Sequence, residues 1–161
     1  HLAVAPNEGT LVASFADGQL RFSPVAGGPR SARGEDMRPV ATECHQPGAL
    51  TGMDVCVRKP LVVTSSLDRT VRVWNYETCE LELSKTLLED PLAVALHPSG
   101  LQVAVGFLDK LRVFHLLLDD LKLFVELPAK GCREVRFSGG GQYIAAANHS
   151  HVVFVFDFLS G

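Results

Sequence analysis

The stretch SSLDRTVRVWNYET, from Ser65 to Thr78, joins a short polar turn to an alternating apolar strand that carries the only tryptophan of the chain, Trp74. Val71 and Val73 fall on one side of this strand, because successive side chains of an extended chain point to opposite faces. Two interpretations are open. The stretch is either an isolated exposed hairpin, or one copy of a repeating unit in which the turn and the tryptophan are linked.

The pattern of strand, polar turn and strand recurs along the whole sequence. The strings LRF, VRVW, LRVF and VFVF each follow a short turn, and each turn follows a strand of small residues. The turn residues Asp68 and Asp109 lie 41 positions apart, and Ser150 follows after a further 41. Self-similarity at about 40–45 residues with about four strands per unit is typical of a β-propeller blade. The sequence therefore predicts an all-β chain and favours the repeating unit.

We expect about four blades, each a four-stranded antiparallel sheet, in a partial ring in which residues 1–161 belong to one propeller. The predicted blades cover residues 1–43, 44–87, 88–129 and 130–161, and the last stops after its third strand. The interval from Asp17 to Asp68 is ten residues longer than the others, and the extra residues fall in 25–38. This segment, VAGGPRSARGEDMR, has no alternation and is predicted to be a flexible loop.

Composition narrows the classes of function. The hydrophobic fraction of 47% and the charged fraction of 20% are those of a folded soluble domain. A net charge of −3 gives no attraction to nucleic acid or to an anionic membrane, and the apolar runs are too short to span a bilayer. The cysteines form no CxxC pair, so the sequence predicts neither a metal site nor a disulfide scaffold, and reduced thiols in the cytosol are expected. These are Cys44, Cys56, Cys79 and Cys132.

The repeat resembles the WD-repeat family over nearly the whole chain. Asn75 and Tyr76 follow Trp74 where the family has Trp-Asp, and His45 stands at the position of its Gly-His, with Cys44 in place of the glycine. The string HPSG, residues 97–100, is similar to the family's turn between the first and second strands of a blade. This resemblance implies a propeller that acts through contacts with other proteins and with its own remaining blades.

The resemblance also implies a buried hydrogen-bond network. In WD-repeat blades the tryptophan donates to a serine, a histidine bonds the serine, and the turn aspartate bonds the histidine. The matching residues here are His45, Ser66, Asp68 and Trp74. A buried indole N–H without an acceptor would cost about 1–3 kcal/mol. Other residues stand at the tryptophan position in the remaining units, so only one unit has the whole set; they are Ser23, Phe114 and Phe156.

Ser66, His45 and Asp68 are also the residue types of a hydrolase triad. That chemistry needs an exposed serine oxygen beside an oxyanion hole, as a GxSxG turn provides. No GxSxG occurs, and Ser66 falls inside a predicted strand. We therefore predict a protein that is not an enzyme, with no catalytic, metal-binding or cofactor-binding residues. Turnover of ester substrates that is abolished by changing Ser66 would favour the hydrolase instead.

Two exposed turns are candidates for partner binding. Leu67 and Leu108 each precede a turn aspartate, and the resemblance places them on the rim where partners of WD-repeat proteins usually dock. Arg69 and Lys110, in the same turns, would form a polar rim around such a contact. The alternative is that both leucines cap the core of their own blades.

A narrower resemblance covers roughly Cys44 to Asn148. Strings such as VVTSSLDRTVRVWNYET, ALHPSGLQVAVGFLDKLRV and KGCREVRFSGGGQYIAAAN are similar to the cilia- and flagella-associated protein fifty-seven family. This family joins WD-repeat propellers to a long coiled coil on the axoneme of motile cilia, beside the inner dynein arms and their regulatory machinery. The resemblance implies a non-catalytic scaffold of the ciliary cytoskeleton. The alternative is a generic cytosolic WD-repeat adaptor, such as a trafficking or ubiquitin-ligase scaffold.

Overall fold

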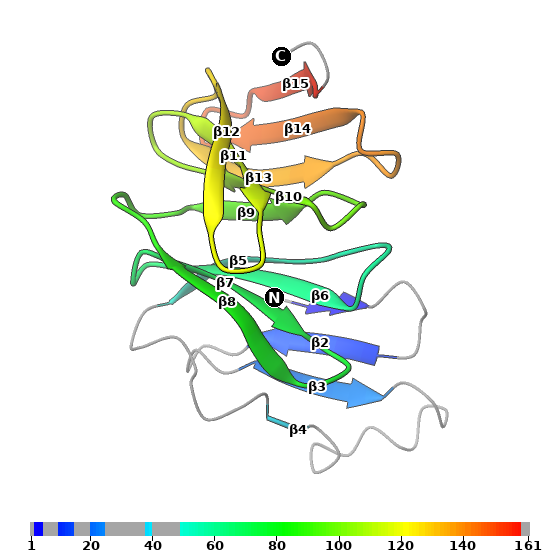
Figure 1. The fold of residues 1–161 in the computed structure, drawn as a ribbon. Helices are drawn as coiled ribbons and strands as arrows, with labels where there is room; N and C mark the ends of the chain where they lie inside the picture. Colours follow the sequence, from blue (N-terminus) through cyan, green and yellow to red (C-terminus); the bar gives the residue numbers. More distant parts are fainter. Residues whose placement is uncertain (1, 5–9, 15–19, 25–37, 40–48, 159–161) are drawn as a thin grey trace.

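The computed structural model describes residues 2–4, 10–14, 20–24, 38–39 and 49–158, and within these ranges all regular structure is β-strand (Figure 1). The strands pair antiparallel with their neighbours in the chain. The prediction of an all-β chain built from four-stranded antiparallel sheets is therefore confirmed. The turn residue Asp17 and residues 25–37 of the predicted loop lie outside the described residues, and Arg38 begins a strand.

Within the described residues there are four sheets, each an up-and-down run of consecutive strands. The first contains β1 (Leu2–Val4), β2 (Thr10–Ser14), β3 (Leu20–Pro24) and β4 (Arg38–Pro39). The second contains β5 (Leu50–Val55), β6 (Leu61–Ser66), β7 (Thr70–Asn75) and β8 (Glu80–Thr86). The third contains β9 (Ala93–Leu96), β10 (Gln102–Gly106), β11 (Leu111–Leu116) and β12 (Leu121–Leu127). The fourth contains β13 (Cys132–Phe137), β14 (Tyr143–Asn148) and β15 (Val153–Asp157).

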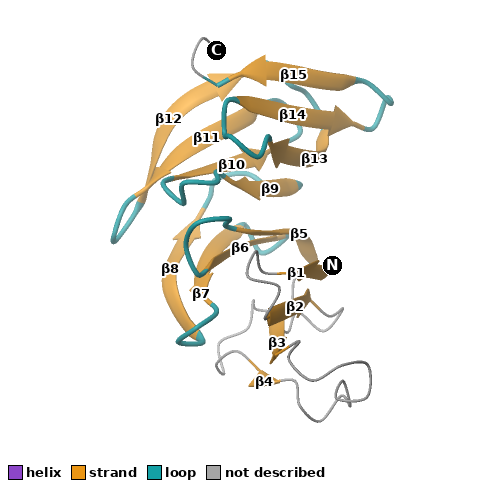
Figure 2. Cartoon of the chain, turned by 90° about the vertical axis from the view of Figure 1, so that its right-hand side faces the viewer, coloured by secondary structure: helices purple, strands orange, loops and turns teal. Residues whose placement is uncertain are grey.

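The sheets are stacked face against face in the order of the chain (Figures 1 and 2). The first strand of each sheet lies innermost: β1 contacts β5, β5 packs against β9, and β9 packs against β13. In the second and third sheets, the turns after the first and third strands then lie on one side of the stack. The turns after their second strands, together with the connections from β8 to β9 and from β12 to β13, lie on the other side.

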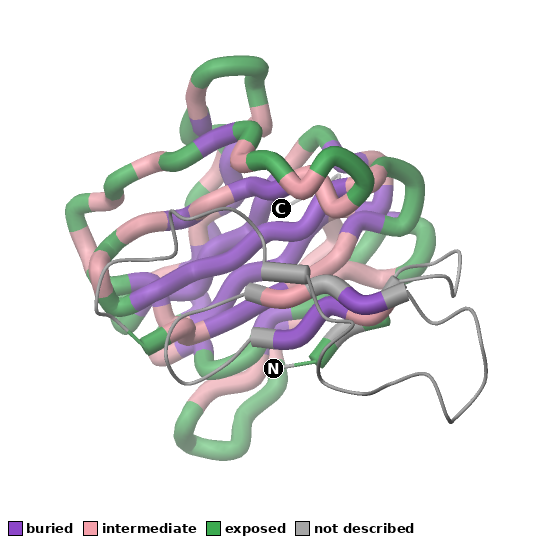
Figure 3. The backbone as a smooth tube through the Cα atoms, turned by 90° about the horizontal axis from the view of Figure 1, so that it is seen from below, coloured by how far each residue is buried: buried purple, intermediate pink, exposed green. Residues whose placement is uncertain are grey.

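Strand alternation explains the cores between the sheets. In the second sheet, Val62 and Trp74 face Val12 of the first sheet, whereas Val63 and Val73 face the third sheet. The second and third sheets thus bury both faces, and their middle strands read as nearly continuous apolar runs, whereas the fourth sheet leaves Tyr143, Val153 and Val155 exposed on its outer face. Figure 3 shows the result, with buried strands crossing the molecule and exposed turns at its margins.

Two sheets carry the same irregularity on their outer strand. In the second sheet Val73 pairs with Leu83 and Trp74 with Leu81, so Glu82 is an extra residue in β8. In the third sheet Val113 pairs with Val125 and Phe114 with Leu123, so Phe124 is the extra residue in β12. A β-bulge re-aims the side chain of the inserted residue. The shared bulge makes Glu82 and Phe124 equivalent positions, and it also makes Phe114 equivalent to Trp74.

Small residues let the third and fourth sheets approach closely. A Cβ atom added to Gly106 on β10 would lie 2.6 Å from the Cβ atom of Cys132 on β13. Ala93, Ala95 and Ala146 are buried in the same layer. A glycine is therefore required at Gly106 by the backbone approach of the neighbouring sheet.

Candidate functional site

The structure corrects the acceptor assigned to Trp74. The indole is almost fully buried, and its Nε1–H donates to Oγ1 of Thr64 at 3.0 Å, rather than to Ser66. Trp74 pairs with Val62 across the strands, and Thr64 is the next residue on the same face of β6. Ser66 lies two residues further along the strand, beyond the reach of the ring. A hydroxyl of β6 accepts from Trp74 as predicted, but it belongs to Thr64, two residues before the predicted Ser66.

The other predicted network residues lie around the turn after β6. Ser66 is fully buried, and its Oγ accepts from the backbone N–H of Asp68 at 3.4 Å. Oδ1 of Asp68 accepts from the backbone N–H and the hydroxyl of Thr70, at 2.9 and 2.6 Å. These contacts fix the turn locally, as aspartate commonly does. His45 lies outside the described residues, so its part in the network stays a prediction.

The candidate partner residues lie on the side of the stack that carries the turns between second and third strands. Leu67 is 50% exposed and Leu108 is 74% exposed, so both leucines present apolar surface to solvent. Arg69 and Leu108 line one hollow of about 380 Å³ together with residues of the connection between β8 and β9. Leu67 and Lys110 lie outside its lining. The connection contributes Leu88, Glu89, Asp90 and Leu92. We call this side the turn surface.

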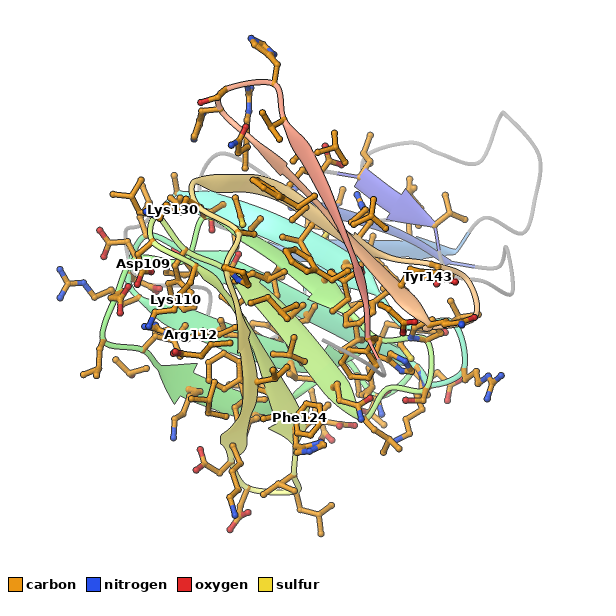
Figure 4. All side chains as sticks on the ribbon, turned by 90° about the horizontal axis from the view of Figure 1, so that it is seen from above. Asp109, Lys110, Arg112, Phe124, Lys130 and Tyr143 are labelled. Atoms are coloured by element: carbon orange, nitrogen blue, oxygen red, sulfur yellow. The ribbon has the colours of Figure 1, made fainter. Side chains whose placement is uncertain are left out.

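Ion pairs hold the polar residues of the turn surface in place. Arg69 Nε donates to Asp90 at 2.7 Å, and Lys110 Nζ donates to Glu126 at 3.0 Å. The hydrogen bond that Lys110 donates to Glu126 raises the pKa of Lys110, and the same bond lowers the pKa of Glu126. Arg112 also donates to Glu126, at 2.9 Å. Figure 4 shows Lys110, Arg112 and Lys130 near one end of the strands and Tyr143 near the opposite end.

The histidine of the HPSG turn, His97, lies between two sheets. His97 follows β9, and its Nε2 lies 3.2 Å from the carbonyl oxygen of Gly141 in the next sheet. The backbone N–H of Ser99 donates to Nδ1 at 3.1 Å, so Nδ1 is unprotonated and Nε2–H donates to Gly141. The ring also packs edge-on against Phe137, with ring centroids 5.0 Å apart. Sequence periodicity carries no signal for such a contact, because it joins two turns.

We expect the stability of the protein to fall as the pH drops below about 6.5, the ordinary pKa of histidine. Burial lowers the pKa of His97, because it disfavours the charged ring. The folded state then binds fewer protons than the unfolded state between the two pKa values, so the stability is present above pH 6.5 and is lost as the pH falls through the folded pKa. The free energy of unfolding, measured with urea at several pH values across this range, should depend less steeply on pH in a His97→Gln variant. An identical pH dependence in both proteins would contradict the prediction.

Asp54 is a second residue that the sequence did not single out. Its carboxylate lies on β5, accepts from the backbone N–H of Leu96 on β9 at 2.8 Å, and pairs with Arg136 on β13 at 2.9 Å. It therefore links the second, third and fourth sheets. Burial raises the pKa of this carboxyl group, and the N–H of Leu96 and the charge of Arg136 oppose that rise. These partners indicate a structural role.

Other kinds of site find no support in the part of the chain that the structure describes. No group of three or more His, Cys, Asp or Glu side chains is placed to hold a metal ion there. Cys56, Cys79 and Cys132 are free thiols. None of the described segments forms a helix that is long and apolar enough to cross a membrane.

Comparison with known proteins agrees with the predicted repeat. Residues 37–75 match the family described as "WD domain, G-beta repeat". The chain superposes on the β-propeller domain of Cps50 (Swd1) from Myceliophteria thermophila with a TM-score of 0.79 and 10% identity, over 99% of this chain and 51% of that domain. This likeness shows the fold alone. The stacked sheets and the repeat together define a WD-repeat β-propeller, as predicted.

Two relatives narrow the resemblance. The chain is 43% identical to cilia- and flagella-associated protein 57 of Mus musculus, over 99% of the chain and 13% of that protein. It is 41% identical to cilia- and flagella-associated protein 57 A of Tetrahymena thermophila, over 99% of the chain and 12% of that protein. The predicted resemblance to this family is therefore confirmed over nearly the whole chain. The chain spans only a small part of the length of these relatives.

Proposed function

We propose that this chain is part of a non-catalytic scaffold of the motile-cilium axoneme, which docks or regulates inner-arm dyneins through protein contacts. The observation that carries the proposal is the identity of 41–43% to two proteins named for cilia and flagella, maintained over 99% of the chain. The protein resides in the cytoskeleton of the cilium or flagellum. Its partners are axonemal proteins, namely inner-arm dynein components and the neighbouring regulatory complex.

The form of the molecule suits this role. A motor must push against a fixed base, and a stack of sheets with buried faces holds its surface turns in defined positions. The candidate turns offer exposed Leu67 and Leu108 beside ion-paired Arg69 and Lys110. An apolar centre with a polar rim is the usual composition of a protein interface. The buried hydroxyl of Ser66, in contrast, is not available to a substrate.

The docking surface is tested with a paired substitution in the full-length protein. Leu67→Glu together with Leu108→Glu, expressed in motile ciliated cells that lack the endogenous protein, should weaken partner binding by at least about tenfold. The inner-arm dyneins retained by isolated axonemes then fall, as measured by quantitative mass spectrometry. Leu123→Glu is the matched control, because this leucine is 48% exposed on β12 but lies away from these turns. Equal dynein levels in all strains would remove the turn surface from the proposal.

A further inference from the structure

The side of the stack opposite the turn surface holds an apolar groove between the second and third sheets. Its volume is about 440 Å³, within the range of about 300–1,000 Å³ that is usual for binding pockets. The floor consists of Leu61, Val73 and Leu83 of the second sheet. The opposite wall consists of Leu101, Leu116, Leu117 and Leu118, of which Leu118 is 100% exposed at the tip of the hairpin between β11 and β12.

The next groove along the stack shows what fills this position when the chain fills it alone. Phe124, the inserted residue of β12, contacts His115 with ring centroids 4.5 Å apart. Its ring centroid also lies 6.0 Å from that of Phe158, which follows β15 of the fourth sheet and packs on Phe137. Figure 4 shows Phe124 on β12, away from the labelled residues of the turn surface. Aromatic rings therefore occupy the junction between the third and fourth sheets.

The strand register identifies the equivalent residues in the open groove. Asn75 pairs with the first residue of β6 as His115 pairs with the first residue of β10, so these two positions correspond. Glu82 corresponds to Phe124, because each is the inserted residue of its outer strand. Where the third sheet has a pair of rings, the second sheet thus has a hydrogen bond from Asn75 to Glu82 at 2.9 Å. No ring of the described chain takes the place of Phe124 in the open groove.

The charges at the mouth of the groove define its occupant further. Glu82 lines the groove, and Glu77, Glu80 and Asp119 are exposed on the turns and strands beside it. Of the nearby lysines, Lys85 pairs with Asp120, whereas Lys59 lines the groove and keeps its charge, because its Nζ donates only to the neutral carbonyl oxygen of Gly100 at 3.2 Å. The four carboxylates outnumber this one lysine and leave an excess of negative charge around an apolar hollow. A basic segment would be attracted to it, whereas an acidic one would be repelled.

From this comparison we propose that the groove binds a segment of a partner protein that inserts one aromatic side chain and carries lysine or arginine on either side of it. The ring packs against the leucines of the groove beside the hydrogen-bonded Asn75 and Glu82, and the flanking cations face Glu82 and its neighbouring carboxylates. This surface lies on the side opposite to Leu67 and Leu108. The assignment therefore goes beyond the proposed function and does not depend on the binding of dynein.

Three labelled peptides of equal length test the assignment by fluorescence anisotropy with the full-length protein. The first has a phenylalanine flanked by lysines, the second a phenylalanine flanked by glutamates, and the third a serine flanked by lysines. We expect the first peptide to bind at least about tenfold more tightly than either of the others, because it alone supplies both the ring and the cations. Equal binding of the serine and phenylalanine peptides with lysines would show a merely acidic surface and overturn the proposal.

Substitutions at Glu82 locate the binding site. Glu82→Phe supplies the ring from the chain itself, as Phe124 does. It should lower the affinity for the first peptide by at least about tenfold while the melting temperature of the protein is retained. Glu82→Lys reverses the charge at an exposed position and should weaken it by a similar factor, which gives a second variant if the first does not fold. Glu134→Lys is the matched control, because Glu134 is exposed on β13, outside the lining of the groove, and it should change the affinity by less than about threefold. Unchanged affinity in both Glu82 variants would overturn the proposal.

Discussion

Replacement of Gly106 by alanine is expected to lower the free energy of unfolding by about 3 kcal/mol, the upper part of the range for overpacked cores. The added methyl group would lie 2.6 Å from the Cβ atom of Cys132 and 3.3 Å from its carbonyl oxygen. These atoms belong to β13 of the next sheet and cannot rotate away. The third and fourth sheets would have to separate, and the buried layer that contains Ala104 and Ile144 would lose contact.

Urea unfolding monitored by circular dichroism measures this effect. Gly139→Ala is the matched control, because a Cβ atom at Gly139 meets nothing within 4 Å. The control should stay within about 0.5 kcal/mol of the parent protein. Equal stability of the Gly106→Ala protein and its parent would show that the two sheets do not approach as closely as described.

The second largest effect is expected from Thr64→Val, which should lower the free energy of unfolding by about 1–3 kcal/mol. Valine keeps the shape of threonine, but it removes the hydroxyl that accepts from Nε1 of Trp74 at 3.0 Å. The indole is 1% exposed, so water does not replace this acceptor without rearrangement of the layer that also holds Val12 and Val62.

Two further variants separate Thr64 from the residue first predicted. Thr64→Ser keeps the hydroxyl and should retain most of the stability lost in Thr64→Val. Ser66→Ala removes a hydroxyl whose contact with the N–H of Asp68 is long, at 3.4 Å, and should have the smaller effect. A larger loss in Ser66→Ala than in Thr64→Val would contradict the assignment of Thr64 as the acceptor.

The sequence was sufficient to predict the fold because the fold is periodic. Alternation at Val71 and Val73 identified strands, and the spacing of Asp68 and Asp109 identified a repeat of the length of a blade. Both signals are local, and both are repeated, so an error at one position is corrected at the next. The family resemblance then supplied the kind of network around Trp74.

The contacts between sheets could not be predicted in the same way. Thr64, Ser65 and Ser66 follow one another, and only the pairing of Val62 with Trp74 decides which hydroxyl meets the ring. His97 reads as a turn residue, and its contact with Gly141 joins positions 44 residues apart. Such contacts depend on how one blade is placed against the next.

The groove lined by Glu82 could not be predicted from single strands either. In the sequence, Glu82 and Phe124 look unrelated, because Glu82 stands at a polar position of the alternating string ELEL, whereas Phe124 stands in the apolar run LFV. The shared bulge makes them equivalent, and only then does the missing ring at Glu82 become visible. An inserted residue changes the strand register without changing the hydrophobic pattern, so the signal was absent from the sequence.

Removal of the full-length protein from a motile ciliated cell tests the proposed function most directly. Isolated axonemes would be compared with those of the parent by quantitative mass spectrometry of every dynein heavy chain, and the beat would be recorded by high-speed video. We expect particular inner-arm dyneins to be reduced and the waveform to change, while outer arms and cilium assembly persist, and the wild-type protein should restore both. Axonemes that keep every inner-arm species at the parental level and beat normally would contradict the account and favour a generic cytosolic adaptor.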